Sequence, residues 1–144
     1  MSGEGAKLFG GRWNSPNLAS TVYLAFPEEA CVQEFVRMAK KQPGGPAAFR
    51  TRVVHEVLVD SLRVLDLRTD DALNAVGLEL SDVHASDMSK CQRVGDAAFY
   101  LQLQGVLTLS ATGVGHVLAV FGDHVEAGQL RVVTSKPMSG FTAK

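Results

Sequence analysis

Residues 21–41 read TVYLAFPEEACVQEFVRMAKK and contain a strand signal followed directly by a helix signal. The first five residues, Thr21 to Ala25, are mostly β-branched, aromatic or apolar, which favours a short strand. Pro27 is tolerated in the first turn of a helix, the two glutamates after it suit the positive end of the helix, and the two lysines suit the other end. We therefore predict a helix from Pro27 to about Lys41.

The segments on either side extend this pair into a mixed order of elements. Stretches rich in β-branched and apolar residues predict further strands, at residues 51–59, 64–67, 106–109, 117–121 and 130–133. Capping signals predict a short helix over residues 69–77 and a longer one over residues 91–104. The chain before residue 18 and the loop Pro43-Gly44-Gly45-Pro46 are expected to be irregular. About six strands and three helices without regular βαβ alternation predict an α+β domain.

Composition narrows the class of protein. The chain has 144 residues, of which 46% are hydrophobic, and a formal net charge of −1. These values suit one globular domain and offer no electrostatic basis for direct nucleic-acid binding. We expect no membrane contact and a cytoplasmic location, because no apolar run approaches the roughly 20 residues of a membrane helix and the N-terminus lacks a signal-peptide pattern. Cys31 and Cys91 are each isolated, which indicates reduced, packed thiols.

Glu34 is the most informative single residue. On the predicted helix it lies four residues after Ala30 and four before Met38, beside Phe35, so its carboxylate points to where the core should be. Burial of an unpaired charge is costly, so this glutamate is paired, protonated or directed into a polar cavity. An ion pair with Arg37, one turn onward, and a functional role fit this spacing equally well.

Two other segments could carry chemistry. In Gly10-Gly11-Arg12-Trp13-Asn14 the glycines let the backbone bend around a ligand, the arginine suits a phosphate, and the tryptophan can stack on a ring. A loop arginine with a tryptophan that anchors the chain to the core is the more common role of such a segment. Ser110 follows a predicted strand and precedes the small-residue segment 111–115, a position that active sites favour. A serine that satisfies backbone groups at a strand end is again more common.

Residue spacing argues against several familiar kinds of site. Thr108 and Thr112 stand where a hydrolase nucleophile elbow needs glycines around Ser110. Leu118 stands where a dinucleotide fingerprint starting at Gly113 needs a glycine or alanine. The four histidines lie in different segments without paired-ligand spacing, so we expect no metal site.

Taken together, these features resemble the RES-domain family, whose name records an arginine, a glutamate and a serine. The similarity runs through GEGAKLFGGRWNS (residues 3–15), VYLA (residues 22–25), Ala30 with Glu34, the segment from Cys91-Gln92 to Gly105, Ser110-Ala111 and the strand at residues 117–121. It covers nearly the whole chain, and the GGRWN and YLA blocks with the downstream glutamate are specific in combination.

The resemblance implies an ADP-ribosyltransferase-like fold, with a mixed β-sheet core and NAD+ bound in a central cleft. It also implies the toxin of a bacterial type II toxin–antitoxin pair, which depletes NAD+ by cleaving the nicotinamide–ribose bond through phosphorolysis or hydrolysis. NAD+ would be the substrate, with no bound prosthetic group. ADP-ribosylation of a protein, or an inactive RES module that only binds the antitoxin, are the alternatives. The expected partner is an Xre-like helix-turn-helix antitoxin, held in a hetero-oligomer.

By the same resemblance, Arg12, Glu34 and Ser110 are the expected catalytic residues. Arg12 would hold the phosphates or the nicotinamide end of NAD+, and Tyr23 would pack on the nicotinamide or the ribose. Trp13 and Asn14 are assigned with them to NAD+ binding. A carboxylate such as Glu34 can stabilise the oxocarbenium character that develops at the ribose when the glycosidic bond breaks.

The resemblance also bears on the extent of the domain. Members of the family usually have an additional strand before the GEGA-like segment, whereas two residues precede that segment here. We therefore expect residues 1–144 to form a single RES domain without that strand.

Overall fold

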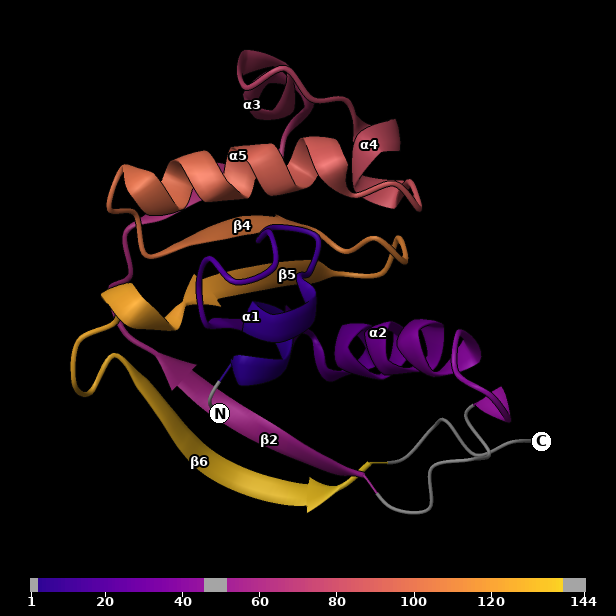
Figure 1. Cartoon of the computed structure of the whole chain (residues 1–144). Coiled ribbons are helices and arrows are strands. Elements are labelled where there is room, and N and C mark those ends of the chain that lie inside the picture. Colours follow the sequence, from indigo (N-terminus) through magenta and orange to yellow (C-terminus); the bar gives the residue numbers. More distant parts are fainter. Residues whose placement is uncertain (1–2, 46–51, 139–144) are drawn as a thin grey trace.

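The computed structural model describes residues 3–45 and 52–138 of the chain. In chain order the elements are α1 (Glu4–Phe9), β1 (Thr21–Phe26), α2 (Glu28–Lys40), β2 (Val53–Val59), β3 (Val64–Leu67), α3 (Asp70–Ala75), α4 (Leu80–His84), α5 (Ser89–Tyr100), β4 (Gly105–Leu109), β5 (His116–Phe121), the 3₁₀ turn η2 (Gly122–His124) and β6 (Leu130–Pro137) (Figure 1). The α+β class is confirmed, as are the predicted strand and helix at residues 21–41. None of the helices in the described ranges has the length and apolar character that crossing a bilayer requires. Pro46 of the expected loop and Thr51 of the expected second strand lie outside the described residues.

Four strands form one sheet in the order β1-β5-β4-β3. Strand β5 is antiparallel to β1 and to β4, whereas β3 is parallel to β4. Successive side chains of a strand point to opposite faces. The pairing register therefore places Tyr23, Thr108 and Val117 on one face of the sheet, and Leu107 and Leu118 on the other.

The first face of the sheet is covered by helices. Figure 1 shows α5, with α3 and α4, on one side of the sheet and the β2–β6 pair on the other. The buried core between sheet and helices contains apolar side chains from both layers, namely Leu67, Val106, Ala119 and Phe121 from strands and Leu73, Val83, Cys91 and Ala98 from helices. Each large apolar side chain buried here contributes about 1.5–3 kcal/mol to folding. This packing holds the N-terminal loop and the end of β4 in fixed relative positions.

The second face of the sheet looks toward β2 and β6, which pair with each other in an antiparallel ribbon. The register of the ribbon shifts between Glu56 and Val57. An ion pair of 2.6 Å joins Lys136 Nζ on β6 to Glu28 Oε1 at the start of α2. The ribbon is therefore tied to the same helix that carries Glu34.

One predicted helix end is wrong. The helix expected to run to Gln104 ends at Tyr100, and Gly105 opens β4 instead of closing the helix. The backbone of Gln102 has a φ of 65°, in the left-handed region, and Leu103 N–H donates to the carbonyl of Ala98, which closes the last turn. Gln104 is then buried, where its side chain donates to the His124 carbonyl and accepts from Arg63 N–H. Residues 101–104 are therefore not helical, because Gln104 bonds to partners in distant loops.

The expectation of about three helices is also wrong, because the described residues contain five. Helix α1 lies in a segment expected to be irregular, and it buries none of its residues, so it has no apolar stripe to reveal it. Helix α4 has five residues and is capped by Glu79 and Asp82, each side chain bonded to the other's backbone. Helices this short contain too few turns for a periodic pattern to be detected.

Candidate active site

The loop that carries Arg12 is bound to strand β1 through Tyr23. The Tyr23 hydroxyl accepts a hydrogen bond from Trp13 N–H at 2.9 Å and donates one to Asn14 Oδ1 at 2.6 Å. Burial of this hydroxyl raises the pKa of Tyr23 above its ordinary value. At Gly11 a Cβ atom would lie 2.5 Å from the Tyr23 hydroxyl, so the close approach of loop and strand requires a glycine.

Helix α5 holds the other side of the same loop. Gln92 Nε2 donates to the Gly11 carbonyl at 2.9 Å, and Asp96 accepts hydrogen bonds from both the backbone N–H and the hydroxyl of Ser15. Gly95, between these two residues, lets the helix touch the loop, because a Cβ there would lie 1.8 Å from the Trp13 carbonyl oxygen. Sequence reasoning did not assign roles to Gln92 and Asp96. Their spacing of four residues, which puts two polar side chains on one face of a helix, is the signal that could have identified them.

Arg12 lies across the end of α4. Its guanidinium donates to the Asp82 carbonyl at 3.1 Å and to the Ala85 carbonyl at 2.7 Å. Carbonyls at a helix C-terminus carry partial negative charge, which a cation stabilises. Because a guanidinium has five N–H donors, these two bonds leave donors for a ligand.

Glu34 and Ser110 meet although they are 76 residues apart in the sequence. The buried Ser110 hydroxyl donates to Glu34 Oε1 at 2.5 Å. The alternative partner of Glu34, Arg37, donates instead to the His84 carbonyl at 3.5 Å, and no ion pair within 4.0 Å joins it to Glu34 in the described part of the chain. In the structure Glu34 is therefore paired with Ser110, and the expected ion pair with Arg37 is not formed.

A series of hydrogen bonds connects the loop after β4 to Ser110. Val114 N–H donates to Thr112 Oγ1 at 3.2 Å, and Thr112 Oγ1 lies 2.7 Å from Ser110 Oγ. Since Ser110 gives its single proton to Glu34, the Thr112 hydroxyl must be the donor between the two hydroxyls. Every donor in this series of hydrogen bonds points toward the Glu34 carboxylate, and the series holds the carboxylate in one position.

A small cavity of about 50 Å³ brings the predicted residues together. It is lined by residues from five separate segments, Arg12, Trp13, Tyr23, Glu34, Thr108, Leu109, Ala111 and Val117. Ser110 lies behind the wall, bonded to Glu34. Trp13 borders the cavity with a side chain that is 1% exposed, which matches the anchoring role that the sequence left open. Asn14 is buried and bonds to the Ala6 carbonyl and to Tyr23, so it supports the loop from behind.

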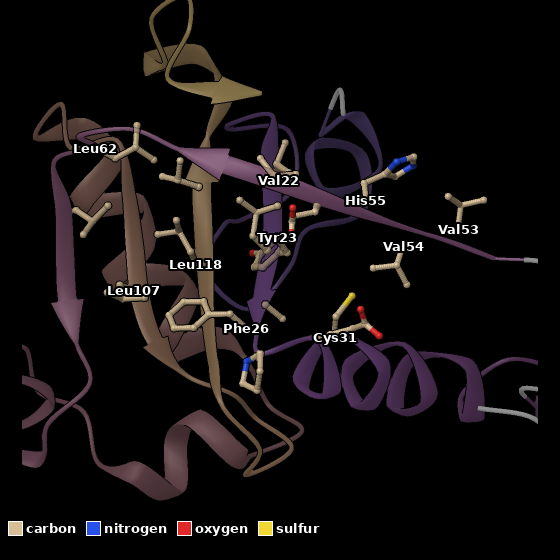
Figure 2. Close-up of a pocket in the computed structure, with 18 residues that line it drawn as sticks. Val22, Tyr23, Phe26, Cys31, Val53, Val54, His55, Leu62, Leu107 and Leu118 are labelled. Carbon is tan, nitrogen blue, oxygen red and sulfur yellow. The ribbon is translucent and has the colours of Figure 1, made fainter. Parts of the chain in front are cut away.

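A much larger apolar groove of about 870 Å³ lies between the second face of the sheet and β2. Figure 2 shows Val22, Leu107 and Leu118 on its sheet side and Val53, Val54 and His55 on strand β2 across from them. Tyr23 lines both this groove and the small cavity, and Cys31 on α2 lines the groove. The groove falls in the size range of small-molecule sites. In the described residues no group of three or more histidine, cysteine or acidic side chains is placed to hold a metal ion.

The chain is similar to a known protein family, to two relatives and to one solved structure. The family model described as "RES domain" matches residues 1–139. NAD(+) phosphorylase MbcT of Mycobacterium tuberculosis (strain ATCC 25618 / H37Rv) is 44% identical over 137 residues, which are 92% of this chain and 72% of that protein. The protein of the same name from Mycobacterium bovis (strain ATCC BAA-935 / AF2122/97) matches to the same extent. Among solved structures, a chain of the M. tuberculosis MbcT–MbcA toxin–antitoxin complex superposes with a TM-score of 0.86 at 41% identity, covering 96% of this chain and 77% of that one.

Proposed function

Because the chain belongs to the RES-domain family, we propose that it is a toxin that depletes NAD+ by cleaving the nicotinamide–ribose bond. The observation that carries the proposal is the meeting of Arg12, Glu34 and Tyr23 around one cavity, with Ser110 bonded to Glu34. Two relatives 44% identical to this chain are named NAD(+) phosphorylases, which supports phosphate as the acceptor of the ribosyl group.

In this reaction the bond between the nicotinamide nitrogen and ribose C1′ breaks, and its electron pair leaves with nicotinamide. A phosphate oxygen then forms a new bond to C1′. Positive charge develops on the ribose between these events, and the Glu34 carboxylate, held by Ser110, stabilises it. Such preorganised electrostatic stabilisation contributes about 3–4 kcal/mol per group in enzymes where it has been measured.

The small cavity indicates where the reacting end of NAD+ would lie. The small cavity contains the carboxylate and the guanidinium and is too small for a dinucleotide, so it takes the reacting end. The groove lies on the other face of the sheet, so only the cavity is assigned to NAD+, although Tyr23 lines both spaces. Tyr23 would therefore pack on the nicotinamide or the ribose, while Arg12 uses its remaining donors on the nicotinamide end or the phosphates. Trp13 and Asn14 would act by shaping the loop.

A protein antitoxin is the proposed partner. The solved relative is a toxin–antitoxin complex, which supports a hetero-oligomer of this chain with its antitoxin. We assign that antitoxin to the Xre-like helix-turn-helix class by family resemblance and place the pair in the cytoplasm. The net charge of −1 gives this chain itself no means of attracting DNA.

The test is to measure cellular NAD+ after induction of this chain alone. Arg12→Ala and Glu34→Gln should abolish the loss of NAD+, and Glu29→Gln, an exposed glutamate on the same helix that lines neither hollow, should not. Purified protein would then be assayed with and without phosphate. Dependence on phosphate supports phosphorolysis, and turnover without it indicates hydrolysis. Unchanged NAD+ with a folded protein would overturn the proposal in favour of protein ADP-ribosylation or an inactive antitoxin-binding module.

A further inference from the structure

The hydroxyl of Ser110 has no capacity left for a substrate. A serine hydroxyl offers one donor and two acceptor positions. Ser110 donates to Glu34 and accepts from the Thr112 hydroxyl at 2.7 Å and from Thr112 N–H at 3.2 Å. It is fully buried and does not line the cavity. Ser110 is therefore a positioning residue for Glu34, and any hydroxyl that meets the substrate must come from another residue.

Thr108 carries a hydroxyl and borders this cavity. It lies two residues before Ser110 on β4, pairs with Val117 in the sheet, and lines the cavity together with Arg12 and Glu34. Thr108 is 1% exposed, and its Oγ1 is the buried side-chain polar atom that lacks a hydrogen-bond partner in the described part of the chain. Buried polar groups are almost always hydrogen-bonded, because an unsatisfied hydroxyl destabilises the fold. Thr108 borders the cavity, and its buried hydroxyl would gain the partner that it lacks when a polar ligand enters there.

The remaining wall of the cavity defines the kind of group that Thr108 meets. Glu34 provides an acceptor, Arg12 provides donors, and the two rings of Trp13 and Tyr23 are apolar surfaces that suit a planar group. A space of about 50 Å³ holds about three or four water molecules, which is about the size of a group of three heavy atoms. A phosphate group is larger than such a group and does not fit this space. A neutral carboxamide has both a donor and an acceptor and satisfies all three polar side chains.

We propose that Thr108 is a substrate-binding residue whose hydroxyl hydrogen-bonds the carboxamide of the nicotinamide end of NAD+. This inference rests on the proposed function and assigns a role to a residue that the family motif does not include. It also gives the two residues different roles: Thr108 on β4 contacts the substrate, and Ser110, just after β4, orients the carboxylate.

The experiment compares Thr108→Val with Thr108→Ser in the full-length chain made by cell-free synthesis. Valine has the shape of threonine without its hydroxyl, whereas serine keeps the hydroxyl. Thr21→Val is the matched control, because Thr21 is a buried threonine on the same sheet whose hydroxyl donates to the Ala19 carbonyl away from the cavity. The measurements are the melting temperature, KM and kcat for NAD+, and inhibition and thermal stabilisation by added nicotinamide.

We expect Thr108→Val to melt at the same temperature as the wild type or higher, because it removes an unsatisfied hydroxyl. Its KM for NAD+ should rise about five- to tenfold, the factor that one neutral hydrogen bond represents, and its inhibition by nicotinamide should weaken by a similar factor. Thr108→Ser should restore both values. Thr21→Val should melt at a lower temperature and keep the wild-type KM.

Wild-type KM and nicotinamide inhibition in Thr108→Val would overturn the inference, since the hydroxyl would then have a structural role alone. A raised KM with unchanged nicotinamide inhibition would overturn the carboxamide assignment in favour of a ribose contact. Failure of the proposed function is separate, because it would appear as a wild type that does not consume NAD+. In that case the thermal stabilisation by nicotinamide, which needs no turnover, still decides whether Thr108 contributes to binding.

Discussion

Substitution of Ser110 by alanine should lower activity only through its effect on Glu34. The Ser110 hydroxyl donates to Glu34 Oε1 at 2.5 Å, and alanine leaves that carboxylate oxygen without this partner. Glu34 itself remains on α2, whose backbone does not depend on the serine. The double variant Ser110→Ala/Glu34→Ala therefore tests the relation between the two residues.

The magnitudes follow from the type of bond. A hydrogen bond to a charged group contributes about 1.5–3 kcal/mol, so Ser110→Ala should lower kcat/KM by about 10- to 100-fold if the bond acts in the transition state. Glu34→Ala removes the electrostatic stabiliser itself, and we expect a loss of about 100- to 1,000-fold, as for single groups of this kind elsewhere. The double variant should be no worse than Glu34→Ala alone. The coupling energy would then equal the whole effect of Ser110, about 1.5–3 kcal/mol.

The assay is nicotinamide release from NAD+ by the wild type, both single variants and the double variant. Melting temperatures serve as the control for folding, because Ser110 is fully buried. A loss of about 1 kcal/mol of stability corresponds to a decrease of about 4 °C for a domain of this size, which leaves the variants folded at the assay temperature. If the two single losses multiply in the double variant, Ser110 contacts the substrate independently of Glu34, and our account of its saturated hydroxyl is refuted.

Other predictions concern the loop that carries Arg12. Arg12→Ala should destabilise the fold by about 1–3 kcal/mol in urea titrations, because it leaves two helix-end carbonyls without their donor, and an unchanged stability would contradict this. Tyr23→Phe should lower the free energy of unfolding by about 1–2 kcal/mol at neutral pH, because Trp13 N–H and Asn14 Oδ1 lose their hydrogen-bond partner. Burial raises the pKa of Tyr23 in the folded protein above 10.0, its pKa in the unfolded chain. The contribution of Tyr23 to folding stability is therefore fully present below pH 10.0 and is lost as the pH rises from there. The wild type should therefore lose stability in that alkaline range more steeply than Tyr23→Phe. Gly95→Ala should destabilise the fold by about 3 kcal/mol or more, because its Cβ would collide with the Trp13 carbonyl. Gly5→Ala, in helix α1 where nothing lies near the added Cβ, should be neutral or should stabilise the fold by about 0.5–1 kcal/mol. Equal melting temperatures for the two variants would contradict the packing argument.

Local signals were sufficient for the elements that are long or strongly marked. Pro27 and the charges at each end of residues 27–41 identified α2, and the period of that helix put Glu34 on its inward stripe. The strand at Val64 to Leu67 was predicted with its observed bounds. These elements depend on propensity, capping and periodicity, which act over a few neighbouring residues.

The same signals failed where distant partners decide the conformation. The end of α5 depends on the left-handed backbone of Gln102 and on the partners of buried Gln104, and neither is visible in a helical pattern. The role of Thr108 was missed for a related reason. Its hydroxyl is distinguished by having no partner, and a sequence does not show which polar groups remain unsatisfied after packing.

The sequence by itself determined the α+β class and most of the elements, because local backbone preferences act between neighbouring residues. It also identified Arg12, Glu34 and Ser110 as candidate site residues through a family motif. The tertiary structure alone decided that Glu34 and Ser110, 76 residues apart, form one hydrogen bond, and that Thr108 is left free beside them. The physical reason is that hydrogen-bond capacity is shared among whatever groups packing brings within about 3 Å, and packing depends on the whole chain.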